Sequence, residues 1–405
     1  MINIKNSAPP LYLTAREAAS ELAISPATLY AYVSRGLIRS EPVGNGRARR
    51  YRADDVRAMH ARRSASTTGA AEAPTAPVLD TTIGAITEAG PIYRGILAVS
   101  LAENATLEQA ATLLWNTSDA DPFDAANLPV VDASMSAIIS AASGASPLAR
   151  AVAALALASD ADPRAHNRSL DGRARVGARA MRLTAAAILG APPSSRPIHQ
   201  QVAAAWTPSD ARSEHLMRLA LVLLADHELN ASTWTVRSAV STGLNLYDGL
   251  IAGLVALKGP RHGGAGPLAA MMAADLAGGD LESKIRERVV LGERIPGFGH
   301  TVYKNGDPRA DVLLQALVAA GADRRMAVDA PALITEATGL YPNIDYALAV
   351  LMRMFGLPVG HETALFAIAR SAGWVAHAIE QLSSGVLIRP HARYVGPQPG
   401  RGSAE

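Results

Sequence analysis

Five segments in the second half of the chain bring histidine, arginine and aspartate together with glycine or proline. They are "DHELNAST" (residues 226–233), "LKGPRHGGA" (257–265), "PGFGHTVYKNGDPR" (296–309), "YPNID" (341–345) and "FAIARSAGWVAH" followed by "IRPHARYVG". A carboxylate with two imidazoles can supply a base for a very weak carbon acid and hydrogen-bond donors for oxygens that gain negative charge. Arginines can hold a dicarboxylate through bidentate pairs. Such a set can form a carbon–carbon bond with neither a metal nor an organic cofactor.

Each of these residues taken alone has an ordinary interpretation. A single histidine is usually a satisfied core or surface residue, so histidines outside the five segments are given no chemical role. These are His60, His166, His199, His215 and His361. His377 and His391 fall inside the last segment and are interpreted as structural. No HExxH or similar ligand spacing is present, so the sequence predicts no metal site.

Helices must position these segments. After residue 80 the chain is rich in alanine and almost free of strand-like alternation. Stretches such as "LEQAATLLW", "SEHLMRLALVLLADHEL" and "TALFAIARSAGWVAHAIEQL" carry apolar residues at positions i, i+3, i+4 and i+7, which is typical of amphipathic helices. We therefore predict an all-α fold for this part.

Length and composition limit the class of protein. The chain has 405 residues, enough for two or three domains, and no cysteine, which excludes a disulfide framework and a cysteine nucleophile. No charged segment precedes an apolar stretch at the N-terminus, and no apolar run approaches the ~20 residues of a membrane helix. We expect a soluble, cytoplasmic protein.

Charge and composition divide the chain into three parts. Residues 1–65 carry a net charge of +6 and the remainder a net charge of −4. The stretch "SASTTGAAEAPTAPV" is small, polar and proline-bearing, as flexible linkers are. We predict a first domain over residues 1–63, a linker over 64–79 and a second domain over 80–405.

The first domain has the helix start and stop signals of a helix-turn-helix. Thr14 with Glu17 fits a capping box, Ser25-Pro26 fits the start of a second helix, and Gly36 fits its end. A hairpin signal, Asn45-Gly46, follows among arginines. Over about residues 11–63 this pattern resembles the MerR-type winged helix-turn-helix.

The MerR resemblance implies contacts to DNA. It makes Thr28, Tyr30 and Arg35 candidates for the recognition helix, and it makes wing arginines candidates for phosphate contacts. The wing candidates are Arg47, Arg49 and Arg50. Alternatively, the tyrosines are partly packed, the arginines form a solvated face, and the domain docks onto a protein.

The second domain resembles citrate synthase. The five segments occur in that family's order, and "GPIYRGILAVSLAENATLEQAATLLWN" is similar to its N-terminal segment, so the resemblance spans roughly residues 80–397. It implies condensation of acetyl-CoA with oxaloacetate and water to give citrate and CoA, a tricarboxylic acid cycle reaction. It also implies a homodimer in which a small domain, roughly residues 260–355, closes on a larger one.

The same resemblance implies residue roles. Asp345 would remove the methyl proton, His262 would donate a hydrogen bond to the thioester oxygen, and His300 would donate to the keto oxygen. His227 and several arginines would bind oxaloacetate: Arg309, Arg370 and, across the dimer interface, Arg389. Tyr303 and Lys304 would border the CoA site.

Two departures from the family pattern keep alternatives open. Gly266-Pro267 stand where Asn-Glu usually follows "HGGA", and "YALAVL" follows "PNID" where an aromatic residue and Tyr-Ser are typical. Both changes touch the acetyl-CoA side. One alternative is therefore 2-methylcitrate synthesis from propionyl-CoA. Another is a regulator that senses oxaloacetate or acyl-CoA and binds DNA.

Overall fold

The computed structural model describes residues 12–22, 24–43, 48–57, 59, 79–117 and 121–396. The chain forms two compact units, Met1–Leu79 and Asp80–Glu405, which are described separately below. All of the expected linker except residue 79 lies outside the described residues, as does His60.

The first unit is a small mixed domain. Its elements are β1 (Tyr12–Thr14), α1 (Ala15–Glu21), α2 (Pro26–Ser34), β2 (Ser40–Pro42) and β3 (Arg49–Arg52). The three strands form an antiparallel sheet in the order β1-β3-β2. Its core contains Leu22, Leu29, Ile38, Tyr51 and Val56.

The helix boundaries of this unit follow from the predicted capping signals. The Thr14 hydroxyl accepts the Glu17 amide hydrogen while the Glu17 carboxylate accepts the Thr14 amide hydrogen, which completes a capping box. Ser25 caps α2 with Pro26 in its first turn, and Gly36, at φ 71°, follows its end. The Asn45-Gly46 turn lies outside the described residues, but Val43 and Ala48 on either side are joined by a backbone hydrogen bond.

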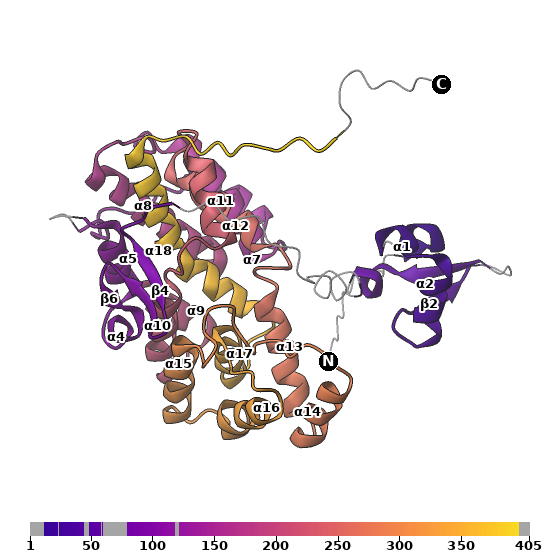
Figure 1. Ribbon diagram of the computed structural model, residues 1–405. Coiled ribbons are helices and arrows are strands. Elements are labelled where there is room, and N and C mark those ends of the chain that lie inside the picture. Colours follow the sequence, from indigo (N-terminus) through magenta and orange to yellow (C-terminus); the bar gives the residue numbers. More distant parts are fainter. Residues whose placement is uncertain are drawn as a thin grey trace, which may run out of the picture. The chain divides into compact units, whose positions relative to one another are not determined.

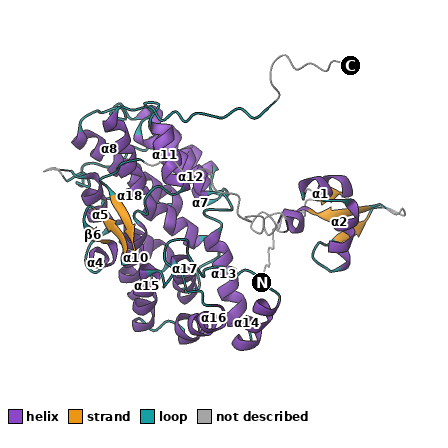
Figure 2. Ribbon diagram, in the orientation of Figure 1, coloured by secondary structure: helices purple, strands orange, loops and turns teal. Residues whose placement is uncertain are grey.

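The second unit is built almost entirely from helices, as Figure 2 shows. The all-α prediction is confirmed. Its helices before the pocket segments are α4 (Ala98–Ala102), α5 (Leu107–Trp115), α6 (Ala133–Ala141), α7 (Pro147–Ala161), α8 (Leu170–Leu189), α9 (Ile198–Trp206) and α10 (Arg212–Leu224). The next are α11 (Ala231–Val240), α12 (Leu246–Leu257), α13 (Ala265–Ala277), α14 (Leu281–Val290) and α15 (Pro308–Ala319). A π-helical turn η1 (Arg325–Asp329) precedes α16 (Ala330–Thr338), α17 (Ile344–Met354) and α18 (His361–Ser384).

A small sheet at the start of this unit was not predicted. Strands β4 (Gly84–Thr87), β5 (Gly90–Tyr93) and β6 (Ile96–Leu97) form an antiparallel meander. Strands of two to four residues are too short to give a clear alternation of apolar and polar residues, which explains the miss. Gly90 turns the first hairpin at φ 112°.

Helix α18 is the centre of the second unit. It packs against α5, α8, α10, α11 and α12, and Figure 1 shows it running through the bundle. Close packing depends on glycines in the facing helices: a Cβ on Gly253 would lie 2.7 Å from the Trp374 ring, and one on Gly177 would lie 2.5 Å from Val375. Residues 367–379 of α18 are all buried, so this part of the helix can hold polar side chains in fixed positions.

Helices α13 to α17 form a second group next to α18 (Figure 1). Helix α13 packs on α17, and α17 packs on α15. Phe298 and Pro342 form an isolated bridge that ties the loop before α15 to the loop before α17. This places residues 296–309 and 341–345 side by side. No helix in the described part of the chain is long and apolar enough to cross a membrane.

Candidate active site

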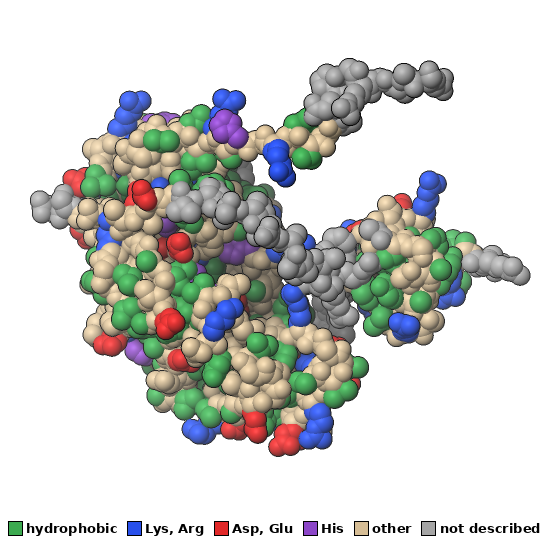
Figure 3. Space-filling view, viewed as in Figure 1, with side chains coloured by type: hydrophobic (Ala, Val, Ile, Leu, Met, Phe, Trp, Pro, Cys, Tyr) green, Lys and Arg blue, Asp and Glu red, His purple; other side chains and the backbone are tan. Residues whose placement is uncertain are grey.

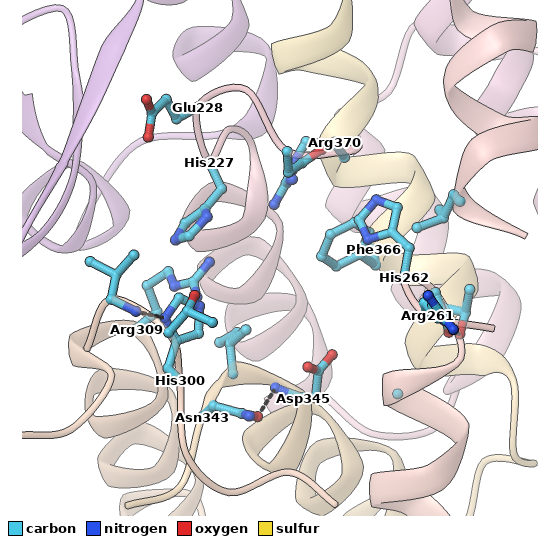
Figure 4. Close-up of a pocket in the computed structure, with 18 of the residues that line it drawn as sticks. His227, Glu228, Arg261, His262, His300, Arg309, Asn343, Asp345, Phe366 and Arg370 are labelled. Carbon is cyan, nitrogen blue, oxygen red and sulfur yellow. Dashed lines mark hydrogen bonds between the residues drawn. The ribbon is translucent and has the colours of Figure 1, made fainter. Parts of the chain in front are cut away.

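A cavity of about 440 Å³ lies where the loops after α10 and α12 meet the loops before α15 and α17 and the first turns of α18. Its charged and polar lining residues include His227, Glu228, Asn230, Arg261, His262, His300, Thr301, Arg309, Asn343, Asp345, Glu362, Thr363 and Arg370. In Figure 4 the labelled side chains surround one common space. Histidine side chains are also visible in a hollow on the face shown in Figure 3. All five segments thus meet here, although the fifth contributes only its part on α18.

His227 lies in the loop between α10 and α11, half-buried against the pocket. Its Nε2 is 3.1 Å from the Tyr303 hydroxyl, and its ring faces the His300 ring edge-on at 5.5 Å between centroids. Burial and the nearby Arg309 and Arg370 guanidinium groups lower the pKa of His227. The ring is therefore neutral at neutral pH.

His300 presents a defined nitrogen to the pocket. Its Nδ1 accepts hydrogen bonds from the amides of Val302, at 3.0 Å, and Tyr303, at 3.3 Å. Burial and Arg309 lower the pKa of His300, so the ring is neutral. A neutral imidazole that accepts at Nδ1 carries its proton on Nε2. His300 can therefore donate from Nε2 without being charged.

His262 is within hydrogen-bonding distance of a buried serine. Its Nε2 is 2.8 Å from the Ser232 hydroxyl, which also accepts a hydrogen bond from Trp374 Nε1 and lies 2.8 Å from Asn230 Oδ1. Burial, followed by the charge of Arg370, lowers the pKa of His262 to about 4. The His262 ring is held through Nε2, so its Nδ1 can contact a ligand.

Asp345 stands in the first turn of α17, next to its cap Asn343. The Asn343 side chain accepts the Asp345 amide hydrogen at 3.0 Å. Within the described residues, no group donates a hydrogen bond to the Asp345 carboxylate. Burial raises its pKa to about 6; Arg309 and Arg370 oppose this shift, while Asp307 and Glu362 add to it. A carboxylate with this pKa is a stronger base than an ordinary aspartate.

Arg309 is fixed by its neighbour Asp307. Its Nε and Nη2 donate to the two carboxylate oxygens at 2.9 and 2.8 Å, and its guanidinium lies 5.4 Å from the centre of the Tyr303 ring. Both Asp307 and Arg309 are almost completely buried. This fork orients the guanidinium edge toward the pocket at the start of α15.

Arg370 is a buried cation with unused hydrogen-bonding capacity. Its Nε donates to the Leu224 carbonyl at 2.8 Å, and its guanidinium lies 4.4 Å over the Phe366 ring. Its Nη1 is buried and has no hydrogen-bond partner among the residues that the structure describes. Burial lowers the pKa of Arg370 to about 10, which leaves it charged at neutral pH. An unpaired buried guanidinium is costly, so the site favours an anionic ligand.

Three expected site residues lie elsewhere. Tyr303 is buried behind His227 and His300, where it supports the two rings and does not line the cavity. Lys304 is exposed, and its Nζ lies 3.4 Å from the His300 carbonyl. Arg389 lies exposed in the extended segment after α18 and does not reach the pocket of its own chain.

Glu362 is a pocket residue that the sequence did not suggest. It is 1% exposed, lies in the first turn of α18, and accepts the Gly360 amide hydrogen at 2.9 Å. A Cβ on Gly266 would lie 2.7 Å from Glu362 Cγ. The departure at Gly266 and the position of Glu362 are therefore linked, but only the fold brings them together.

The candidate DNA-contact residues of the first unit differ in their exposure and in the contacts that they make within the unit. Tyr30 is 54% exposed and Arg35 is exposed. The Thr28 hydroxyl contacts Ser25, Arg49 donates to Ser40, and Arg50 pairs with Glu41 over the Tyr12 ring. Arg47 lies outside the described residues.

No cluster of three or more His, Cys, Asp or Glu in the described part of the chain is arranged to hold a metal ion.

Family comparisons agree with this geometry. A family model described as citrate synthase, C-terminal domain, matches residues 72–391, and a model described as helix-turn-helix domain matches residues 12–64. Citrate synthase 2 of Bacillus subtilis is 41% identical over 187 residues, which cover 44% of this chain and 50% of that protein. The 2-methylcitrate synthase of Shewanella oneidensis is 36% identical over 191 residues, or 45% and 51% of the two chains. The chain thus matches about half the length of these relatives.

Solved structures match over a longer span. Citrate synthase from Thermotoga maritima has a TM-score of 0.67 and 26% identity, covering 82% of this chain and 96% of that one. The citrate synthase of Thermoplasma acidophilum, in a ternary complex with carboxymethyl coenzyme A and oxaloacetate, has a TM-score of 0.67 and 25% identity, covering 82% and 97%.

Proposed function

The chain belongs to the citrate synthase family, and on this premise we propose that it joins acetyl-CoA to oxaloacetate, with water, to give citrate and CoA. The observation that carries the proposal is the shared pocket of one raised-pKa carboxylate, three neutral imidazoles and two buried arginines. This set supplies a base, two oxygen donors and a binding site for a dicarboxylate.

The keto-acid side of the pocket consists of His227, His300, Arg309 and Arg370. We assign oxaloacetate to it because two guanidinium groups converge there and Arg370 Nη1 lacks a partner. His300 Nε2–H would donate to the keto oxygen as the new bond forms. Arg389 is proposed to reach the same substrate from a second copy of the chain, which makes a homodimer part of the proposal.

The thioester side consists of His262, Asp345, Glu362 and Gly266. Asp345 would take a proton from the acyl methyl group. Ser232 would turn its hydroxyl hydrogen from Asn230 to His262 Nε2, so that His262 carries its proton on Nδ1, donates it as a hydrogen bond to the thioester oxygen and stabilises the enol. Closure of residues 260–355 on the rest would exclude water before this step. Water then hydrolyses the citryl-CoA thioester. The chemistry draws on these side chains and on CoA, and we place it in the cytoplasm.

Propionyl-CoA is the competing substrate. It differs from acetyl-CoA by one methyl group, a difference worth about 1–3 kcal/mol in a fitted pocket. Both departures from the family pattern lie on the thioester side, and the relatives include both citrate and 2-methylcitrate synthases. The choice of acyl group is therefore the open part of the proposal.

The helix-turn-helix domain supports a second role, DNA binding. Its exposed groups on or next to α2 are Tyr30 and Arg35, whereas the side chains of Arg49 and Arg50 make intramolecular contacts. A metabolite-sensing regulator on a citrate synthase fold would use this domain as its output. A gel shift that weakens steeply with salt would support DNA binding, since phosphate contacts release counterions. No shift at low salt would favour a docking domain.

Thiol release by the purified protein tests the enzyme proposal. We expect CoA release from acetyl-CoA or propionyl-CoA that requires oxaloacetate and disappears in the Asp345→Asn and His300→Ala variants. The chain has no cysteine, so every thiol detected belongs to CoA. Oxaloacetate binding without thiol release from either thioester would overturn the enzyme proposal and leave the regulator.

A further inference from the structure

Helix α18 carries a line of polar side chains that continues beyond the pocket. Arg370, His377 and Glu380 follow one another along one face of this helix. Arg370 lines the pocket, but His377 and Glu380 do not. His377 is fully buried, and the Glu380 side chain is 20% exposed. The two residues therefore serve something other than direct substrate contact.

His377 faces the carboxylate of Asp226, the residue before His227. The distance from His377 Nε2 to Asp226 Oδ1 is 3.3 Å, a close polar contact, and neither atom makes a well-aligned hydrogen bond within the described residues. His377 Nδ1 is 3.2 Å from Arg237 Nη1. Because a guanidinium can only donate, Nδ1 accepts, and Nε2 presents a proton to Asp226.

Asp226 in turn holds the backbone on both sides of His227. Its Oδ2 accepts the Glu228 amide hydrogen at 3.2 Å, and its own amide donates to the Tyr93 hydroxyl at 3.1 Å. Glu228 is left-handed, at φ 55°, a conformation that is strained for a non-glycine residue and persists only when its surroundings impose it. The Asp226 carboxylate is part of what imposes it.

The other end of the network reaches the start of the second unit. Arg237 Nη1 donates to Glu380 Oε2 at 2.6 Å. The Glu380 carboxylate accepts hydrogen bonds from the Thr82 amide at 2.8 Å and the Thr81 hydroxyl at 2.9 Å. Residues 81 and 82 precede β4, whose Ile86 lines the pocket. The network therefore joins two segments that both reach the substrate space.

We propose that Asp226 and His377 are positioning residues for His227, and that Glu380, through Arg237, anchors them to Thr81 and Thr82. An apolar pair would fill the same volume without the penalty of burying a carboxylate. We attribute the retention of this buried carboxylate to its role beside a substrate-binding histidine: the Asp226 amide is fixed by Tyr93, and the Asp226 carboxylate holds Glu228. The proposal rests on the proposed oxaloacetate site, because it assigns His227 to the keto acid.

Two substitutions at one position test the proposal. His377→Leu removes the contact to Asp226 and the hydrogen bond from Arg237, whereas His377→Gln keeps one donor and one acceptor on a flexible amide. We expect His377→Leu to raise the oxaloacetate KM about 10- to 100-fold, as misplacement of a binding group does, with the acyl-CoA KM changed far less. His377→Gln restores most of the difference. Leu155→Ala, a buried change in α7, serves as the control for general destabilisation.

A second readout separates this proposal from the proposed function. The ¹⁵N chemical shifts of the His227 ring, assigned with a His227→Gln variant, report its tautomer and surroundings without any reaction. If the wild-type protein releases no CoA, the proposed function fails, and a shift of the His227 signals in His377→Leu still supports positioning. Equal changes in all kinetic constants, as in Leu155→Ala, together with unchanged His227 signals would overturn it.

If His377→Leu does not fold, a milder variant tests whether the network positions His227. Glu380→Gln weakens the outer end of the network and leaves Asp226 and His377 intact. A selective rise in the oxaloacetate KM, with a shift of the His227 signals, supports the proposal. An unchanged oxaloacetate KM with unchanged His227 signals contradicts it.

Discussion

The keto-acid side and the thioester side of the pocket are held in different ways. On the keto-acid side, Asp307 grips Arg309 with two hydrogen bonds, Arg370 is anchored to the Leu224 carbonyl, and His227 contacts Tyr303. On the thioester side, the Asp345 carboxylate accepts no hydrogen bond within the described residues, and Gly266 has no side chain. A binding surface gains from fixed charges, whereas a base gains from a carboxylate that accepts no hydrogen bond and whose pKa is raised by burial.

The largest effect should come from the thioester side. Asp345→Asn removes the proposed base without a large change in volume, so we expect kcat to fall about 10³-fold while oxaloacetate still binds. Steady-state thiol release, with oxaloacetate binding measured by calorimetry, gives both quantities. Residual activity close to wild type would show that another group takes the proton. It would then be wrong to describe the thioester side as the side that holds the base.

The keto-acid side should instead fail through binding. Arg370→Gln removes a buried guanidinium whose Nη1 awaits a partner, so we expect the oxaloacetate KM to rise about 100-fold, as for a desolvated charge pair. The acyl-CoA KM should change much less. Arg353→Gln, at an exposed arginine on α17, is the matched control and should leave both constants unchanged. Equal increases in both KM values would contradict the assignment of Arg370 to the keto acid.

The unpaired carboxylate should also lower stability. The folded-state pKa of Asp345 is about 6, above its ordinary value of 3.8, so the folded protein holds this proton more tightly than the unfolded chain. Stability from this group is therefore present at low pH and lost as pH rises from about 4 to about 6. Asp345→Asn should raise the free energy of unfolding by about 3 kcal/mol at pH 8 and by less at pH 5. Urea unfolding at both pH values measures this, and a less stable variant at pH 8 would contradict it.

The pH dependence of the rate should separate the sides further. Asp345 must be ionised to act as a base, so kcat/KM should fall as pH decreases through about 6. The negative charge of Glu362 helps to keep the Asp345 pKa high. Glu362→Gln should therefore move the acid limb of the profile to lower pH. A limb that stays in place, or moves to higher pH, would show that Glu362 does not act on the base.

The sequence predicts the fold class and which residues line the pocket better than it predicts the contacts that each of these residues makes. Apolar spacing was enough to predict helices over the second unit, but the strands of β4 to β6 were too short to give a pattern. The order of the motifs placed His227, His262, His300, Arg309, Asp345 and Arg370 in one pocket. Tyr303 was expected at the CoA site, but the turn after His300 directs it inward. Local sequence does not encode that direction.

Glu362 illustrates the other limit. Nothing in "GHETALF" indicates a pocket carboxylate, because its position depends on the first turn of α18 and on the missing side chain at Gly266, 96 residues earlier. Arg389 illustrates a third limit, since the contact that we propose for it, from a second copy of the chain, cannot be located within one chain. Patterns along the sequence therefore predict which residues share a pocket. They predict the individual atomic contacts in that pocket less well.

The smallest expected effect tests the packing of the thioester side. Gly266→Ala would place a Cβ 2.7 Å from Glu362 Cγ, so Glu362, whose carboxylate is fixed by the Gly360 amide, must shift. We expect the acyl-CoA KM to change a few-fold, corresponding to about 1 kcal/mol for a modest overpacking, and the ratio of acetyl-CoA to propionyl-CoA turnover to change with it. The oxaloacetate KM should stay at the wild-type value because no keto-acid residue touches Gly266. Gly144→Ala, at an exposed turn with open space around an added Cβ, controls for loss of a glycine. A change confined to the oxaloacetate KM would mean that the two sides are coupled through α18 and are not held independently.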